Sequence, residues 1–467
     1  MTRQLSIAFF LSCLALQADE LKHQTLPNNN PGMILSHFAF GSCWKSSRSQ
    51  KHWQPIVANQ PQFWLWLGDN IYGDTDDMEV LRKKYGKLGS TPGYQKLAAS
   101  CPILAIWDDH DYGKNDAGND YVQRAESQKV FLEFFNERPD SVRHKRQGVY
   151  TSYYFGPADK RVQLILLDTR YFRSPLKRIK GKPPYRRMGK WKPDNSPAAT
   201  ILGDTQWKWL EDELKKPARI RLIGTSIQFA APHNGYETWL NMPLEYQRMI
   251  DLIKKTKAEG VVFLSGDIHS SELCIAEPEG CYPLIDFTSS SLNLPLGAAS
   301  THRRTGPAFG GANFGTVQID WDAADPVISI STKDIRNATR LYHRVPLSNL
   351  TFAAKNLENH SKATDFEGEW QTFYGPITLK KNVGNQWQLT SEDRKAELMM
   401  IDKNLTGTWT GGKQHGKVTF SLNRDGKFLK GSYSYEDLPL QLDWAGWKAD
   451  WEKHFKRDDY YLRKKKK

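Results

Sequence analysis

Four short apolar runs of this sequence each lead into side chains that can bind a metal ion. The runs lie at 38–40, 63–67, 103–106 and 261–264, and each has the pattern of a short buried strand. Buried carboxylates at a strand end are costly unless a cation or hydrogen bonds compensate them. Because sites in layered α/β folds form outside the carboxyl ends of strands, we predict one metal centre there. Its predicted ligands are Cys43, Asp69, Tyr72, Asp109, Asp267 and His269.

The donor atoms in this set predict two different metal ions. Asp69 can bridge both ions, and Tyr72, three residues later, can reach one of them as a phenolate. Phenolate and the Cys43 thiolate are anionic donors, and together they favour Fe(III). The second ion would bind the oxygens of Asp69, Asp109 and Asp267, which suits Ca, Mg or Mn.

His110 follows Asp109 directly and is predicted to act in catalysis rather than as a ligand. It would face the leaving group as a cation or general acid. The two flanking carboxylates, Asp108 and Asp111, are predicted to orient Asp109 and His110.

Charge and composition indicate a folded protein with an anionic partner. The chain has 467 residues, 39% of them hydrophobic, and a formal net charge of +13. Ten basic residues and no acidic ones lie in 170–192, a stretch with Pro and Gly that is typical of a long loop. Beside an active site such a loop would attract an anionic substrate, and a solvated insertion is the alternative. No nucleic-acid motif accompanies it, and no apolar stretch after the N-terminus is long enough to span a membrane.

Residues 1–18 have the pattern of a secretory signal, with Arg3 before an apolar stretch and Ala18 at the expected cleavage point. We therefore expect a secreted or periplasmic protein. In an oxidising compartment Cys274 and Cys281, which flank a turn-rich spacer, could form a disulfide.

Strand-like runs alternate with helical patterns from about residue 36 to 340, which predicts an α/β layered domain with helices covering a mixed sheet. After about residue 352, short β-like runs separated by Gly and Asn predict a small β-sandwich or barrel. Its tryptophans could form a sugar-binding face or pack in its core. They are Trp370, Trp387, Trp409, Trp444, Trp447 and Trp451.

Six motifs in fixed order resemble the PhoD-like alkaline phosphatases of the calcineurin-like metallophosphoesterase superfamily. The resemblance covers roughly residues 36–345. The motifs are FGSC, LGDNIYGD, WDDHDYGKND, LLDTR, LGDTQWKWL and SGDIHSSE.

This resemblance implies a four-layer α/β/β/α core with a dinuclear centre of Fe(III) and Ca; Mg, Mn and Zn are alternatives for the metals. Cys43, Asp69, Tyr72 and His269 would hold the iron, and Asp69, Asp109 and Asp267 the second metal. Asn115 would bind a further calcium or the substrate. Asp109 replaces the Asn of the superfamily's Asn-His-Asp/Glu triplet, and Asp267 replaces the first His of its His-x-His. Both changes put an anionic donor in place of a neutral one, consistent with a harder second metal.

Two further residues are candidates for substrate contact. The forked guanidinium of Arg170 matches phosphate oxygens, although a structural role is nearly as well supported. His233 could be a ligand or a substrate contact, and a lone loop histidine is more often structural.

The predicted function is a secreted phosphoester hydrolase that uses a metal-activated water, with phosphomonoesters or phosphodiesters as substrates. The alternative is a secreted glycan- or wall-binding protein with a structural metal site and a polysaccharide contact in the C-terminal part. The predicted divisions are a signal peptide at 1–18, a phosphatase domain at 19–350 and a β-module at 355–467.

Overall fold

The computed structural model of the chain describes most residues from 21 to 448. The described residues are 21–181, 189–296, 304–305, 308–353, 366–372, 375–391, 394–401, 404–411, 414–422, 428–433, 442–443 and 446–448. The predicted signal peptide, residues 182–188 of the basic loop, Trp444, Trp451 and the side chain of Trp447 lie outside this description.

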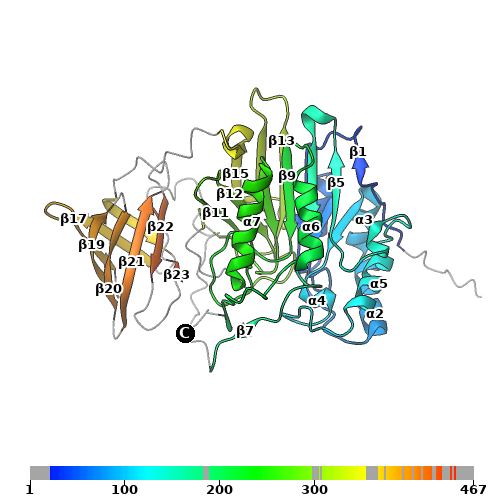
Figure 1. The fold of residues 1–467 in the computed structure, drawn as a ribbon, viewed down its shortest axis with the longest axis horizontal. Coiled ribbons are helices and arrows are strands. Elements are labelled where there is room, and N and C mark those ends of the chain that lie inside the picture. Colours follow the sequence, from blue (N-terminus) through cyan, green and yellow to red (C-terminus); the bar gives the residue numbers. More distant parts are fainter. Residues whose placement is uncertain are drawn as a thin grey trace, which may run out of the picture.

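Two mixed sheets form the α/β part of the chain (Figure 1). The first sheet has the order β1-β5-β6-β9-β10-β12-β11, and the second has the order β15-β14-β13-β2-β3-β4. The strands of the first are β1 (Asn29–Asn30), β5 (Thr151–Phe155), β6 (Val162–Leu166), β9 (Ile220–Thr225), β10 (Val261–Ser265), β12 (Leu284–Ser289) and β11 (Ser271–Ala276). Those of the second are β15 (Thr339–Pro346), β14 (Val327–Asp334), β13 (Asn313–Asp320), β2 (His37–Gly41), β3 (Trp64–Leu67) and β4 (Ile103–Ile106).

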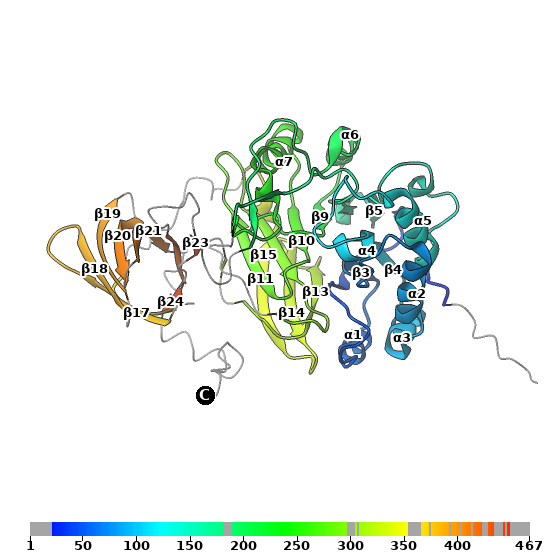
Figure 2. The same cartoon turned by 90° about the horizontal axis from the view of Figure 1, so that it is seen from below.

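Helices cover the two sheets from opposite sides (Figure 2). Helices α6 (Gly203–Leu214) and α7 (Pro243–Thr256) lie on one side, and α1 (Trp53–Ala58) and α3 (Pro92–Ser100) lie on the other. The remaining helices are α2 (Met78–Gly89), α4 (Asp109–Tyr112) and α5 (Arg124–Phe134). None of the helices within the described ranges combines the length and the hydropathy needed to cross a bilayer.

Side chains that alternate between the two faces of the buried strands contribute to two separate hydrophobic cores. In β3, Leu65 and Leu67 join the core that contains side chains of both sheets and of α6 and α7. Trp64 and Trp66, on the opposite face of the same strand, join the core formed with α1, α2, α3 and α5. Successive side chains of a strand point to opposite faces, so a continuously apolar strand is packed on both of them.

The predicted α/β part is confirmed in its elements. The strand-like runs that precede the candidate ligands form β2, β3, β4 and β10, and α6 and α7 are among the helices that alternate with the strands. The base of the basic loop is a short hairpin, in which β7 (Lys177–Arg178) pairs with β8 (Trp191–Lys192).

The separate all-β region is a closed barrel rather than a sandwich. Its strands pair in the order β16-β17-β18-β19-β20-β21, and β21–β22, β22–β24 and β24–β16 pairings close the ring. They are β16 (Gly368–Thr372), β17 (Gly375–Lys381), β18 (Gln386–Ser391), β19 (Lys395–Ile401), β20 (Asn404–Gly411), β21 (Gln414–Leu422), β22 (Phe428–Tyr433) and β24 (Gly446–Lys448), with β23 (Leu442–Asp443) on β22.

The prediction of a sugar-binding face is wrong for three of the six tryptophans. Trp370, Trp387 and Trp409 are buried in one cluster with the aliphatic residues of the barrel. Their positions belong to the inward-facing set of each strand, because closing a sheet into a barrel buries one face of every strand. These three side chains form the barrel core, which was the other alternative.

The disulfide that the sequence allowed between Cys274 and Cys281 is not formed. Both cysteines are buried, and no disulfide joins them. Cys274 lies within β11, and the antiparallel register places Asp286 of β12 opposite it. The partner strand begins after Cys281, at Leu284, so the hairpin never brings the two thiols face to face.

Candidate metal centre

The ends of β2, β3 and β10 bring the predicted iron ligands together. The Cys43 thiol lies 3.2 Å from Asp69 Oδ2, and the Tyr72 hydroxyl lies 3.0 Å from the same oxygen. Tyr72 Oη is 3.5 Å from His269 Nε2. One donor atom each of Cys43, Asp69 and His269 lies within 4.8 Å of the other two, so a single ion could contact all three residues.

The carboxylates that follow β4 form a second group of donors around Asp109. Asp69 and His110 each offer a donor atom within 4.8 Å of Asp109, and so do Asp108 and Asp267 in a neighbouring group. Asp69 therefore belongs to both the thiolate-containing group and the carboxylate group, as a bridging residue must. The predicted second set omitted Asp108, which here faces the centre itself.

Four of the predicted ligands have a left-handed backbone conformation. The φ angles are 61° for Cys43, 50° for Asp69, 70° for Asp267 and 55° for His269. A non-glycine residue in this region is uncommon and costs of order 1–3 kcal/mol, and such strain concentrates at functional sites.

Two glycines allow the strand ends to approach one another at the centre. Gly68 precedes Asp69 with a φ of +93°, and a Cβ there would lie 2.4 Å from Asp108 Cβ. Gly266 precedes Asp267, and a Cβ there would lie 2.7 Å from Ser42 Oγ. A side chain at either position would force two ligand-bearing segments apart.

Backbone and hydroxyl contacts orient two of the predicted iron ligands, His269 and Cys43. His269 Nδ1 donates to the Leu294 carbonyl oxygen at 2.7 Å, which leaves the lone pair of Nε2 facing Tyr72 and Asp69. Ser290 Oγ accepts the His269 N–H at 3.1 Å and lies 3.1 Å from Cys43 Sγ. Ser290 was not predicted, and a lone serine carries no motif that would single it out.

His110 lies at the mouth of the site, packed on Tyr72 with ring centroids 4.2 Å apart. Its Nδ1 lies 2.7 Å from Asp74 Oδ1. Burial opposes a charge on this imidazole, but Asp69, Asp109 and Asp74 outweigh it and raise the pKa of His110 to about 11. These carboxylates favour the protonated form of His110 in the metal-free protein.

The electrostatics of the donor set fit a bound cation. Burial is the largest cause that raises the pKa values of Asp69, Asp267, Cys43 and Tyr72, and neighbouring anions raise them further. Asp69 Oδ1 and Asp108 Oδ2 are buried and have no hydrogen-bond partner among the described residues. Buried anions with unused lone pairs are stable only beside a positive charge, which a multivalent metal would supply.

Asp109 is the carboxyl of the centre that is held ionised by its neighbours. Burial raises its pKa, but Arg170, His110 and the Asp116 N–H outweigh burial and lower it to about 2. The Asp116 N–H donates to Asp109 Oδ2 at 2.6 Å, and the His110 N–H donates to Oδ1 at 2.8 Å.

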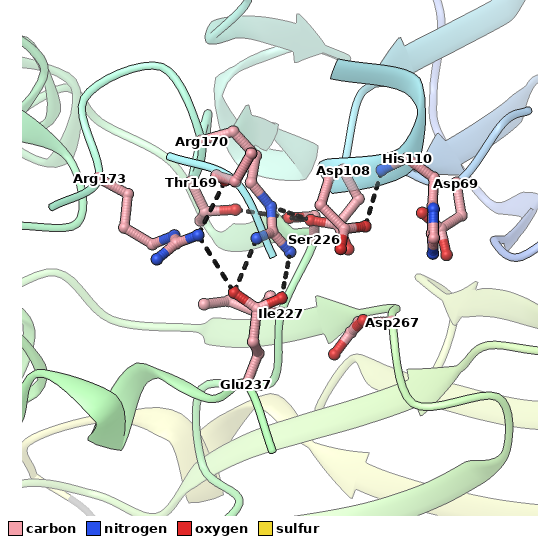
Figure 3. A network of polar contacts seen from close by, with 12 residues as sticks. Asp69, Asp108, His110, Thr169, Arg170, Arg173, Ser226, Ile227, Glu237 and Asp267 are labelled. Atoms are coloured by element: carbon pink, nitrogen blue, oxygen red, sulfur yellow. Dashed lines mark hydrogen bonds and ion pairs between the residues drawn. The ribbon is translucent and has the colours of Figure 1, made fainter. Parts of the chain in front are cut away.

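Arg170 is at the centre but faces protein carboxylates (Figure 3). Its Nε donates to Asp108 Oδ1 at 2.5 Å, and its two terminal nitrogens donate to Glu237 at 2.7 and 3.0 Å. The Arg170 side chain is 0% exposed. These contacts match the structural alternative for Arg170, while the phosphate clamp stays a prediction. Glu237 completes this network through an ion pair with Arg173.

Two predicted residues do not join the donor groups formed by the described residues. Asn115 is exposed on the segment after α4. His233 is buried, and burial lowers its pKa to about 4. Neither of its ring nitrogens has a hydrogen-bond partner in the described part of the chain. The roles suggested for both residues stay predictions.

The fold and the donor groups define an α/β protein with strand-end clusters that could hold metal ions. A family model described as PhoD-like phosphatase matches residues 38–307, which is more than half of the chain. The chain therefore belongs to the PhoD-like phosphatase family, and the resemblance predicted from its motifs is confirmed.

Two known proteins are similar to this chain. Alkaline phosphatase D of Bacillus subtilis (strain 168) is 23% identical over 295 residues, covering 54% of this chain and 48% of that protein. The chain thus matches about half the length of this curated relative. A solved structure described as "Structure of PhoD" matches with a TM-score of 0.53 and 18% identity, covering 69% of this chain and 72% of that one. At this identity the likeness supports the fold alone.

Proposed function

We propose that the chain is a secreted, metal-dependent phosphoester hydrolase of the alkaline phosphatase or phosphodiesterase type. The observation that carries this proposal is the convergence of thiol, phenol, imidazole and carboxylate donors on Asp69. Family membership gives the reaction class, and the strand-end geometry supports a site at which it could occur.

The metals would be held by two overlapping sets of residues. Cys43, Asp69, Tyr72 and His269 would hold Fe(III), whose preference for anionic donors fits the thiolate and the phenolate. Asp69, Asp109 and Asp267 would hold Ca, with Mg, Mn or Zn as alternatives, and Asp108 can join this set. When bound, such a pair supplies an activated water and withdraws charge from the phosphoryl oxygens.

His110 would assist departure of the leaving group. Asp74 accepts the Nδ1 proton and so leaves the Nε2 proton available for transfer to the leaving oxygen. Contact with the tilted Tyr72 ring helps to hold the imidazole beside the centre. In this proposal Asp109 stays ionised while His110 carries the proton.

The domain boundaries are proposed to be those predicted from the sequence. A signal peptide at 1–18 would direct export, 19–350 would form the phosphatase domain, and 355–467 the β-module. The packing of the two sheets between helices supports a four-layer α/β/β/α core. Trp370, Trp387 and Trp409 lie in the barrel core and are therefore not available for a polysaccharide contact.

The test is a comparison of Asp69→Ala with the wild type on chromogenic phosphate esters, alongside metal analysis of both proteins. Asp69 contributes to both donor groups, so we expect loss of bound metal and a fall in rate of about a hundredfold or more. Asp204→Ala is the control, because this α6 side chain is 100% exposed. Near wild-type hydrolysis by Asp69→Ala would contradict the proposal.

A further inference from the structure

Lys45 is held beside the metal centre by contacts to its backbone. Its N–H donates to Asn293 Oδ1 at 2.7 Å, and its carbonyl accepts from Asn293 Nδ2 at 2.9 Å. The preceding N–H, of Trp44, donates to the Asp69 carbonyl at 3.0 Å. Lys45 thus lies on the segment that carries Cys43, and this segment is fixed to Asn293 and to the strand end that carries Asp69.

The Lys45 side chain extends over the rim of the centre. Its ammonium lies 5.3 Å from the centroid of the Tyr72 ring. Lys45, Tyr72, His110, Asp267 and His269 are all partly exposed, whereas Asp69 beneath them is buried. Lys45 is therefore one of the residues around Asp69 that solvent, and a dissolved substrate, can reach.

Lys45 differs from the other cations near the centre because its ammonium contacts the Tyr72 ring but pairs with no carboxylate of the described residues. Arg170 is occupied by Asp108 and Glu237. Lys84 donates to the carbonyls of Tyr72 and Gly73, and Lys190 lies 2.6 Å from Asp116. Within the described part of the chain, the Lys45 ammonium makes no ion pair or hydrogen bond, although a long flexible lysine at a rim readily pairs with any carboxylate in reach.

We propose that Lys45 is a substrate-contacting residue, which binds the phosphoryl group and selects phosphate monoesters over phosphate diesters. This inference rests on the proposed function and deepens it by naming the substrate class. At alkaline pH a monoester carries two negative charges and a diester one. Coulomb attraction to a single ammonium grows with the substrate charge, so Lys45 gains more from the monoester.

The experiment compares Lys45→Gln, Lys45→Arg and Lys51→Gln with the metal-loaded wild type. Rates are measured on 4-nitrophenyl phosphate and on bis(4-nitrophenyl) phosphate at about pH 8, above the second pKa of a phosphate monoester near 6. Lys51→Gln is the matched control, because it removes the same charge from an exposed lysine six residues further on. Metal content and the affinity for inorganic phosphate, measured by calorimetry, are recorded for each protein.

Lys45→Gln is expected to lower kcat/KM for the monoester by about tenfold or more, mainly through KM, because a charge-assisted hydrogen bond is lost. The fall for the diester should be smaller, so the monoester-to-diester ratio decreases. Inorganic phosphate should bind more weakly by a similar factor. Lys45→Arg should keep the ratio, and Lys51→Gln should change neither value.

Three results would overturn the assignment: an unchanged ratio in Lys45→Gln, an equal change in Lys51→Gln, or loss of metal from Lys45→Gln. A wild-type protein inactive on both esters would instead contradict the proposed function. In that case the phosphate-binding measurement still tests Lys45, so the two failures are distinguishable.

Discussion

The Arg170 guanidinium binds both carboxylate oxygens of Glu237, with hydrogen bonds of 2.7 and 3.0 Å. The remaining guanidinium nitrogen, Nε, donates to Asp108, so one buried cation joins the end of β4 to the loop before α7. The exposed fractions of the Arg170 and Glu237 side chains are 0% and 3%. This pair fixes the position of Asp108, and with it the second donor group.

Glu237→Ala should destabilise the protein strongly, because it leaves Arg170 buried with a single carboxylate. Breaking a buried ion pair in this way costs about 3–5 kcal/mol of unfolding free energy. Asp140→Ala, which breaks an exposed pair with Arg138, should change stability little. Chemical denaturation of both variants measures the difference. Equal effects would mean that the buried pair is no more important than the surface pair.

Tyr72→Phe should remove a visible absorption band from the iron-loaded protein. A tyrosinate bound to Fe(III) gives a charge-transfer band, and the Tyr72 hydroxyl is the phenol next to Asp69 Oδ2. Tyr85→Phe is the control, since Tyr85 is a buried tyrosine whose hydroxyl donates to Asp111 outside the predicted iron set. A wild-type protein that binds iron but shows no such band would contradict ligation by Tyr72.

Removing metal with a chelator should lower the melting temperature. The buried carboxylates Asp69, Asp108 and Asp109 then lose their compensating charge. A ligand that binds only the folded state stabilises it by about 2.7 kcal/mol at a hundred times its Kd. Differential scanning calorimetry with and without added metal measures this shift. Asp69→Ala should show little metal dependence, and a wild-type melting temperature insensitive to chelator would argue against a bound metal.

The stability of the metal-free protein should depend on pH through Asp286. Burial raises the pKa of this carboxyl from 3.8 to about 6, even though it accepts hydrogen bonds from Ser265, Phe229 and Ala230. The folded state therefore holds its proton more tightly than the unfolded chain. The stabilisation is fully present below pH 4 and is lost as the pH rises to 6, a change of about 2–3 kcal/mol.

Urea unfolding of the wild type and Asp286→Asn from pH 4 to 7 tests this dependence. The difference in unfolding free energy between the two proteins should fall between pH 4 and 6 and stay constant above. Asp204→Asn, which makes the same change on an exposed side chain, is the control. A constant difference for Asp286→Asn would show that this carboxyl titrates normally.

Most of the candidate site could be predicted from local sequence, because the donor residues directly follow short apolar strands. An apolar run followed by Gly-Asp identifies both a buried strand and a ligand beyond it, as at Gly68-Asp69 and Gly266-Asp267. Asp108 was predicted to orient its neighbours, yet its own Oδ2 faces the centre. Asp108, Asp109 and His110 follow one another in the sequence, so the direction in which each side chain points decides its role. The surrounding fold determines that direction.

Contacts between distant segments could not be predicted in the same way. Arg170 and Glu237 are 67 residues apart, and Ser290 is 247 residues from Cys43. The Cys274–Cys281 bridge failed because strand register, not sequence spacing, determines which side chains face each other across a hairpin. The sequence left open whether the barrel tryptophans are exposed or buried. Closure of the ring decided that the strand faces carrying Trp370, Trp387 and Trp409 are buried.

The sequence by itself determined the α/β elements, the family and the set of donor residues, because hydrophobic periodicity and motif spacing are local properties. Only the tertiary structure decided which donor atoms lie close enough to bind one ion, which arginine is paired with carboxylates and which lysine is not. Those outcomes depend on distances across the two sheets and on burial, since the charge of Arg170 is neutralised by Asp108 and Glu237 while that of Lys45 is not.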